Sequence, residues 1–216
     1  MISDDAKVLL GIGLVTGMIF AGVIITGNKS AQPPEPVAAE ILIRDDSWQQ
    51  ETPNAAITLV EFLDMECEAC RAAHPQIKQI LEDYQGQITY VVRYFPLHKN
   101  SELAMKTVEA AGEQGKYWEM FDLLFERQTE WGEKSEPQTV LFTAYAEELG
   151  LDMAKFSTAL ESSTYEDKIE RDRRDGITAG VSGTPTVFIN GEVVEAFPTY
   201  NTLKGLIDQE LAEQAE

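Results

Sequence analysis

The two cysteines of this 216-residue chain stand three positions apart, as Cys67-Glu-Ala-Cys70. This spacing brings two sulfurs within one helical turn, so the pair can form a disulfide and open it again. The motif follows an apolar run that predicts a buried strand, and it begins a helical pattern. Because a helix N-terminus stabilises a thiolate, we expect an exposed Cys67 to be the attacking sulfur in disulfide exchange. Cys70 is expected to be more buried and to resolve the mixed disulfide.

Two other uses of the pair stay open. A structural disulfide between Cys67 and Cys70 would close almost no loop and would therefore stabilise little. A metal site could add His74 and His98, the only two histidines, because two cysteines with two histidines can bind zinc. However, His98 follows a different strand, and no pattern fixes it beside the pair. We expect no metal and interpret both histidines as ordinary surface or half-buried residues.

The pattern of elements around the motif alternates between strand and helix. Residues 56–63 and 88–95 are rich in β-branched and apolar residues and predict two strands. The helix between them, 68–84, has one apolar face and is interrupted by Pro75, which should kink it. The sequence therefore begins as strand, helix, strand, with the cysteines between the first two elements.

Helical periodicity dominates the next segment, residues 100–175, which contains no convincing strand. Its charged stretch, 166–175, predicts the solvated face of a long helix. Strand character returns at 186–189, and Asn190-Gly191 predicts a hairpin turn into a second short strand. A final amphipathic helix is expected from about residue 200 to 212.

The N-terminal segment belongs to a different class. Residues 8–27 contain no charged residue, and at about 1.5 Å per residue they reach roughly 30 Å, the thickness of a bilayer core. We interpret them as an uncleaved transmembrane signal-anchor; a cleaved signal peptide is the second interpretation. The short tail, residues 1–7, favours a main body outside the cytoplasm. Residues 28–52, with three prolines near their start, predict a linker and entry segment.

Composition excludes several classes of function. Asp and Glu number 37 against 17 Lys and Arg, which gives a net charge of −20. Such an acidic chain repels phosphate backbones, so nucleic-acid binding is not expected. Two cysteines also exclude a disulfide-dense scaffold and a four-cysteine zinc site.

Three blocks, residues 59–70, 93–97 and 180–191, carry a family resemblance. They hold the CxxC motif, an Arg-Tyr-Phe-Pro-Leu segment, and a Thr-Pro pair before a strand and hairpin. With these blocks the chain resembles the DsbA family of thiol-disulfide oxidoreductases, in its membrane-anchored bacterial branch. The resemblance implies an α/β, thioredoxin-like fold with an inserted helical domain, here preceded by one N-terminal transmembrane helix.

The resemblance also implies roles for individual residues. Cys67 matches the nucleophile and Cys70 the resolving cysteine. Thr184 and Pro185 match the cis-proline loop, which exposes backbone to an extended substrate. Glu61 stands where the fold keeps a buried acid, which could take and return the proton of Cys70. The alternative for Glu61 is an edge-strand carboxylate in water.

The chain departs from the family pattern between the cysteines, where Glu68 and Ala69 stand in place of the usual Pro followed by His or another residue. Glu66, Glu68 and Asp64 surround Cys67 with negative charge. Like charge disfavours ionisation, so we expect these residues to tune the pair by raising the pKa of Cys67 relative to strongly oxidising relatives. A less stabilised thiolate means a weaker oxidant, with a potential between those relatives and thioredoxin.

These observations predict an enzyme: a protein thiol-disulfide oxidoreductase in the bacterial cell membrane, single-pass, with its catalytic domain outside the cytoplasm. It would oxidise unfolded or partly folded secreted proteins, need no cofactor beyond its own disulfide, and be recycled by a membrane redox partner. A reductase or isomerase of the same fold, or a non-enzymatic chaperone module, are the alternatives. The predicted thioredoxin-like domain comprises 53–99 and 176–216, and the inserted helical subdomain comprises 100–175.

Overall fold

The computed structural model describes residues 36–215, and its centre is a five-stranded sheet in the order β1-β3-β2-β4-β5. The strands are β1 (Trp48–Gln50), β2 (Ile57–Leu63), β3 (Ile88–Tyr94), β4 (Thr186–Ile189) and β5 (Glu192–Val193). β2 and β3 run parallel, with Ile57 opposite Ile88 and Leu63 opposite Tyr94, and the other pairs are antiparallel. Parallel pairing makes β2 and β3 end at the same edge of the sheet, which is where the cysteine motif begins.

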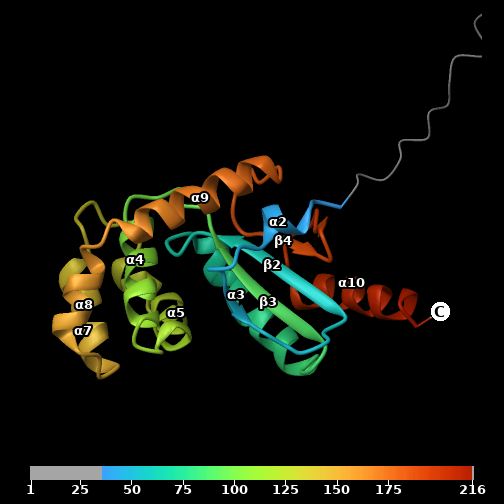
Figure 1. Ribbon diagram of the computed structural model, residues 1–216, viewed down its shortest axis with the longest axis horizontal. Helices are drawn as coiled ribbons and strands as arrows, with labels where there is room; N and C mark the ends of the chain where they lie inside the picture. Colours follow the sequence, from blue (N-terminus) through green and yellow to red (C-terminus); the bar gives the residue numbers. More distant parts are fainter. Residues whose placement is uncertain (1–35, 216) are drawn as a thin grey trace, which may run out of the picture. The chain divides into compact units, whose positions relative to one another are not determined.

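Helices cover both faces of this sheet (Figure 1). One face packs against α3 (Glu68–Asp83) and α10 (Tyr200–Glu213), with Leu203 and Ile207 in the same apolar cluster as Leu59. The other face carries a smaller cluster, and α2 (Ala39–Leu42) and α9 (Thr164–Thr178) lie on it. β2 and β3 are apolar on both faces because both are covered, as expected of central strands. The thioredoxin-like α/β architecture is therefore confirmed.

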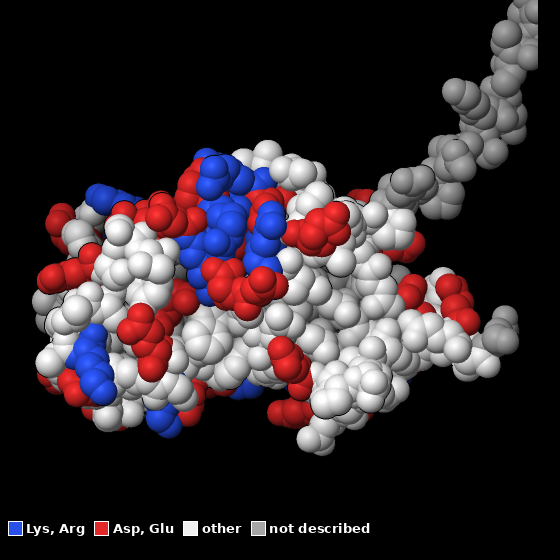
Figure 2. All heavy atoms as spheres, in the orientation of Figure 1, with Lys and Arg blue, Asp and Glu red and all other residues white. Residues whose placement is uncertain are grey.

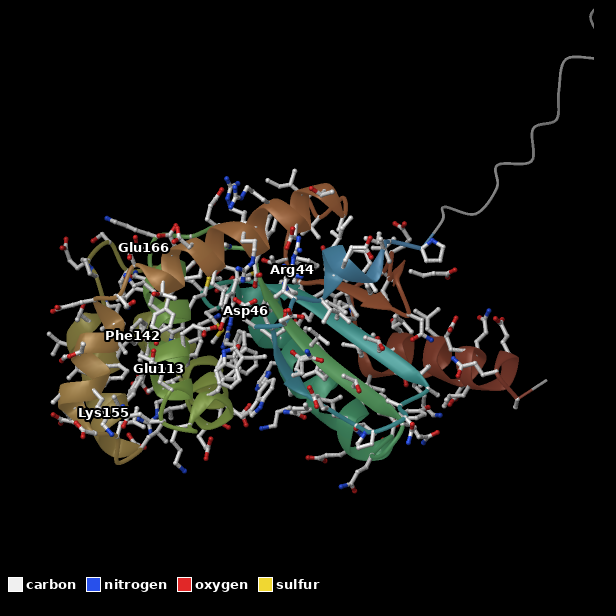
Figure 3. All side chains as sticks on the ribbon, in the orientation of Figure 1. Arg44, Asp46, Glu113, Phe142, Lys155 and Glu166 are labelled. Atoms are coloured by element: carbon white, nitrogen blue, oxygen red, sulfur yellow. The ribbon has the colours of Figure 1, made fainter. Side chains whose placement is uncertain are left out.

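A block of helices is inserted between β3 and β4, as predicted. It consists of α4 (Ser101–Gly112), α5 (Tyr117–Glu126), α6 (Gln128–Trp131), α7 (Thr139–Glu148) and α8 (Met153–Leu160). Trp131 and Phe142 meet edge to face in its interior, with ring centroids 5.1 Å apart. Figure 3 shows Phe142 among the side chains between these helices. The aromatic side chains fix the block as a packed unit beside the sheet.

The entry segment contributes more structure than the sequence indicated. β1 pairs antiparallel with β3 and lies within the predicted linker, residues 28–52. Trp48 anchors it by stacking on Tyr117, with ring centroids 4.2 Å apart. A strand of three residues is too short to show a period of two, which explains why no pattern revealed it. The expected border between residues 175 and 176 falls inside α9, so the two parts of the chain are joined there by a continuous helix.

The interpretation of residues 166–175 as a solvated helix face is wrong for three of its charged side chains. Lys168, Asp172 and Asp175 are buried, and the two aspartates pair with the wholly buried Arg93 of β3, at 2.8 and 2.6 Å. Arg44 adds a second guanidinium on Asp175, at 2.7 Å. A periodicity argument assigns charge to solvent, and only sequence-distant partners make this burial favourable: Arg93 and Arg44 for the aspartates, and Glu109 for Lys168.

Basic side chains of the molecule gather over α9 in one view, with acidic side chains around them (Figure 2). Most of these arginines have an acidic partner: Arg171 pairs with Asp46, and Arg173 with Glu170. Arg44 and Asp46 lie beside α9 in Figure 3. This surface is therefore a mixed network rather than an unpaired basic patch.

The predicted transmembrane helix, residues 8–27, lies outside the described residues, as do the short tail and the start of the linker. Among residues 36–215, no helix is both long enough and apolar enough to cross a bilayer.

Candidate active site

Cys67 is the N-cap residue of α3, and Cys70 lies in the first turn of that helix. Both cysteines are free thiols. Cys67 is 9% exposed and Cys70 is fully buried, so the order of accessibility matches the prediction, although Cys67 is far less exposed than expected. The amide of Cys67 donates to the carbonyl of Asp64 at 3.1 Å, which closes the turn between β2 and α3. The sulfur of Cys67 therefore sits at the positive end of a helix dipole.

The surroundings of Cys67 lower its pKa to about 5. The largest cause is a hydrogen bond from the Cys70 thiol, and the backbone amides of Cys70 and Ala69 act in the same direction, while burial opposes them. All of these donors favour the thiolate. No neighbouring carboxylate is among the main causes of this pKa, and the expectation that Asp64, Glu66 and Glu68 raise it relative to strongly oxidising relatives stays a prediction.

Two of the three carboxylates are already engaged by backbone amides. Asp64 is fully buried and accepts hydrogen bonds from the amides of Glu66, at 2.9 Å, and Leu97, at 2.7 Å. Its Oδ2 also contacts Nδ1 of His98 at 2.7 Å. Asp64 thus ties the turn after β2 to the turn after β3, and its charge is offset by these donors.

Glu66 has a similar role toward the helical block. It is 3% exposed and accepts from the amide of Asn100 at 2.6 Å and from that of Glu133 at 2.9 Å. Glu68, by contrast, is exposed at the start of α3, where solvent screens its charge. The acidic residues around the motif therefore mainly build the loop.

Glu61 is buried in β2, the middle strand of the sheet, and is not an edge-strand carboxylate. Burial raises its pKa to about 7, although a hydrogen bond from Tyr90 opposes the rise and the charge of Cys67 adds to it. Burial also raises the pKa of Cys70 well above its usual value, and the hydrogen bond to Cys67 and the charge of Glu61 add to this. The site thus holds one acidic thiol, one very weak thiol, and a carboxyl group that titrates near neutral pH.

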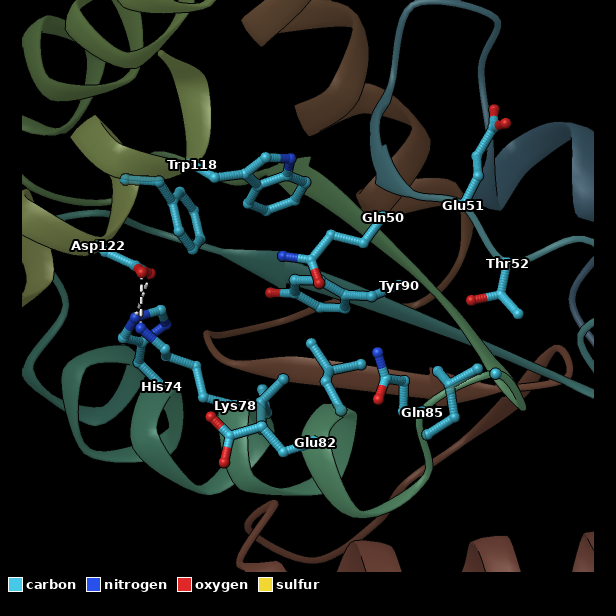
Figure 4. Close-up of a pocket in the computed structure, with 15 residues that line it drawn as sticks. Gln50, Glu51, Thr52, His74, Lys78, Glu82, Gln85, Tyr90, Trp118 and Asp122 are labelled. Atoms are coloured by element: carbon cyan, nitrogen blue, oxygen red, sulfur yellow. Dashed lines mark hydrogen bonds and ion pairs between the residues drawn. The ribbon is translucent and has the colours of Figure 1, made fainter. Parts of the chain in front are cut away.

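Tyr90 of β3 fixes Glu61, because its hydroxyl donates to Glu61 Oε2 at 2.5 Å. The same side chain lies in the wall of a cleft of about 450 Å³, together with Trp118, Ile77 and Leu81 (Figure 4). The cleft lies between α3, α5 and the β1–β3 edge of the sheet. Tyr90 thereby joins the buried acid to a solvent-accessible side of the molecule.

The loop before β4 lies against the sulfur of Cys67. The Thr184–Pro185 bond is cis, which confirms the prediction from the resemblance. The Cys67 thiol donates to the carbonyl oxygen of Thr184 at 3.3 Å. Residues 117 positions apart in the sequence therefore meet at the reactive atom.

One residue of this site was missed by the sequence interpretation. Gln128 of α6 is buried and donates to the carbonyls of Met65, at 2.8 Å, and Cys67, at 3.0 Å. No spacing signal marks a lone glutamine in a helical segment. His98 was also undervalued, although the parallel strands place residues after β2 and residues after β3 at one edge.

The position of His74 gives no support to the zinc alternative. His74 lies in α3 and contacts Asp122 at 3.0 Å while stacking on Phe125. Within residues 36–215, no three His, Cys, Asp or Glu side chains are grouped so that they could hold a metal ion.

A family model and several solved structures share this architecture. The thioredoxin family model (Thioredoxin_4) matches residues 50–209. BdbD from Bacillus subtilis, in its oxidised form, superimposes with a TM-score of 0.70 at 22% identity, over 82% of this chain and 96% of its own. Alpha-DsbA1 from Wolbachia pipientis gives 0.71 at 21% identity, over 80% and 94%. A thioredoxin-like oxidoreductase from Silicibacter pomeroyi gives 0.69 at 24%, over 83% and 100%.

The curated relatives that match this chain in sequence are named as Na(+)/H(+) antiporters. A Na(+)/H(+) antiporter NhaA 3 of Salinispora tropica is 39% identical over 140 residues, which are 63% of this chain and 20% of that protein. A Na(+)/H(+) antiporter NhaA 1 of Mycolicibacterium gilvum is 32% identical over 199 residues, 88% of this chain and 31% of that protein. The chain thus spans between a fifth and a third of the length of these relatives.

Proposed function

Because this chain belongs to the thioredoxin family, we propose that it is a thiol-disulfide oxidoreductase that oxidises protein dithiols to disulfides. The observation that carries the proposal is the asymmetry of the pair. The pKa of Cys67 is lowered to about 5, whereas that of Cys70 is raised well above its usual value. A sulfur that is stable as a thiolate is a good leaving group, so the Cys67–Cys70 disulfide tends to be reduced and its partner oxidised.

The proposed reaction has two exchange steps. A substrate thiolate attacks Sγ of Cys67, forms a mixed disulfide, and displaces Cys70 as a thiolate. A second substrate thiolate then attacks the substrate sulfur of the mixed disulfide and releases Cys67 as a thiolate. The substrate loses two electrons and forms a disulfide, while the Cys67–Cys70 pair gains two electrons and becomes a dithiol.

Glu61 is the proposed proton donor to Cys70. The displaced Cys70 thiolate is unstable where it is, because burial raises the pKa of Cys70. Glu61 has a pKa of about 7 and is therefore near half protonation at neutral pH, so it can supply the proton when Cys70 leaves and accept it when the pair is oxidised again. Its charge raises the pKa of Cys70 further, which favours the transfer.

The Thr184–Pro185 loop is the proposed docking edge for substrate. Its carbonyl lies 3.3 Å from the reactive sulfur, so an extended peptide paired with this backbone would bring its own cysteine to Cys67. Leu97, whose amide is held by Asp64 and whose side chain is 52% exposed, would add an apolar contact for unfolded chains.

Location and partners follow from the resemblance and from the apolar run of residues 8–27. We infer a single-pass protein of a bacterial cell membrane, whose catalytic domain faces away from the cytoplasm and acts on secreted proteins with free cysteines. A membrane redox partner would reoxidise the pair. We propose no ion transport for this chain, since it spans only a fifth to a third of the relatives named as antiporters and its site carries thiol chemistry.

The test is substrate oxidation together with trapping. The oxidised protein should oxidise a dithiol peptide stoichiometrically, and Cys70→Ser should accumulate mixed disulfides through Cys67, whereas Cys67→Ser should trap none. Oxidation of the protein by the peptide disulfide, in place of the reverse, would favour the reductase alternative. Failure of Cys70→Ser to trap any thiol partner would favour a binding module.

A further inference from the structure

His98 lies at the edge of the sheet where β2 and β3 both end. The two strands are parallel, with Leu63 opposite Tyr94, and the amide of Phe95 donates to the carbonyl of Leu63 at 2.8 Å. The segment after β3 therefore runs beside the turn that leads to Cys67. This topology brings His98 to the cysteine motif, although 31 positions separate them in the sequence.

Asp64 holds His98 in that place. Its Oδ2 contacts Nδ1 of the ring at 2.7 Å and accepts from the amide of Leu97 at 2.7 Å, so both backbone and side chain of the segment are fixed. The His98 amide also donates to Ser101 Oγ at 3.0 Å. The His98 side chain remains 46% exposed, and its Nε2 makes no hydrogen bond within residues 36–215. A buried carboxylate thus orients a half-exposed ring at the rim of the site.

The surrounding charges favour the imidazolium form of this ring. Partial burial opposes that form, but the hydrogen bond and the charge of Asp64, followed by the charges of Cys67 and Glu66, raise the pKa of His98 overall. Those three groups all come from the turn after β2. Lys99 and Glu102 follow in its own segment and in α4.

We propose that His98, oriented by Asp64, is a positioning residue that stabilises the Cys67 thiolate of the reduced pair. Without His98, the charge of Asp64, three residues before Cys67, would be offset by backbone amides alone; the His98 cation neutralises it and so favours the thiolate. The chain has no histidine between its cysteines, so this one acts from the neighbouring strand.

The proposal rests on the proposed function and adds a consequence to it. If His98 binds its proton more tightly beside the thiolate, the thiolate must by reciprocity be more stable beside protonated His98. The dithiol form then gains stability that the disulfide form lacks, which makes the pair more oxidising. This gain is lost as pH rises through the pKa of His98.

The first experiment measures the pKa of Cys67 in the reduced full chain from the ultraviolet absorbance of the thiolate. His98→Gln should raise that pKa by about 0.5–1 unit, and His98→Lys, which keeps a cation, should restore most of the shift. Lys99→Gln removes an equal charge one residue away and should change the pKa by less than about 0.2 unit. Equal shifts in His98→Gln and Lys99→Gln would overturn the proposal.

The second experiment reads the same coupling from the histidine. The pKa of His98, followed by NMR, should fall on passing from the reduced protein to Cys67→Ser by the same amount that His98→Gln raises the pKa of Cys67. An unchanged His98 titration would overturn the proposal. Failure of the proposed function would show in a different measurement, because the wild-type protein would then not oxidise a dithiol peptide.

Discussion

Each face of the sheet buries an ionisable side chain, but only one of the two side chains is paired with groups of opposite charge. On the face covered by α9, Arg93 is fully buried and forms ion pairs with Asp172 and Asp175, at 2.8 and 2.6 Å. On the face covered by α3, Glu61 is equally buried but receives only the hydroxyl of Tyr90. Within residues 36–215, no cation pairs with Glu61.

The difference separates structure from chemistry. A buried charge with partners stays charged and holds elements together, whereas a buried acid without a cation moves its pKa toward neutrality and can exchange its proton. Burial accordingly raises the pKa of Glu61 to about 7, and Glu61 lies beside the cysteine whose proton must move. The α9 face therefore carries buried ion pairs that stabilise the fold. The α3 face carries the carboxyl group to which we assign the proton transfer.

The largest expected effect is on the α9 face. Arg93→Met leaves Asp172 and Asp175 buried without their shared partner and should cost about 3–5 kcal/mol of unfolding free energy. Arg44→Met, a matched change at a partly exposed guanidinium on the same Asp175, should cost less than about 1 kcal/mol. Urea denaturation compares the two, and equal costs would show that the burial of Arg93 is not what matters.

Glu61→Gln should act with the opposite sign. The pKa of Glu61 is about 7 in the folded chain, against 4.5 for the free group. The free energy of unfolding is therefore highest below pH 4.5 and decreases as the pH rises from 4.5 to about 7. Glutamine escapes this penalty, and at pH 8 the variant should be more stable than wild type by about 3 kcal/mol.

The same variant should be impaired in catalysis. Without the acid, protonation of displaced Cys70 should slow about tenfold or more at pH 7, as read from stopped-flow formation of the mixed disulfide. A Glu61→Gln protein that is destabilised at pH 8, or that reacts at the wild-type rate, would contradict the assignment of Glu61.

A smaller effect is expected at Tyr90. Tyr90→Phe removes the hydrogen bond that lowers the pKa of Glu61, so that pKa should rise by about 0.5–1 unit above 7. The pH dependence of the mixed-disulfide step measures it. Tyr94→Phe also removes a buried hydroxyl, but one bound to Glu109, and should leave the Glu61 pKa in place.

The smallest effect is expected at Glu68. The carboxylate is exposed at the start of α3, so Glu68→Gln should change the pKa of Cys67 by less than about 0.3 unit at physiological salt. Thiolate absorbance measures the change. A drop of a full unit in the pKa of Cys67 would show that Glu68 destabilises the thiolate.

Features that depend on residues close together in the chain could be predicted from the sequence. The apolar runs located β2 and β3 to within one residue, the Asn190-Gly191 turn located the β4–β5 hairpin, and the CxxC spacing located the reactive pair. Each of these depends on neighbours in the chain, which is why a pattern reveals them.

Features that depend on distant partners were not readable. Asp172 and Asp175 of α9 are buried because Arg93 lies under them, and Asp64 and Glu66 are bound by amides from the turn after β3, the start of α4 and the segment after α6. Gln128 reaches the cysteine turn from a helix of four residues. None of these contacts has a spacing that marks it.

The reduction potential of the Cys67–Cys70 pair tests the central claim most directly, by equilibration with glutathione at pH 7. A Cys67 pKa of about 5 lies between those of thioredoxin, about 7, and DsbA, about 3.5. The account therefore predicts a potential between about −270 and −120 mV. A value at or below about −270 mV would make the chain a reductant and contradict its role as a dithiol oxidase.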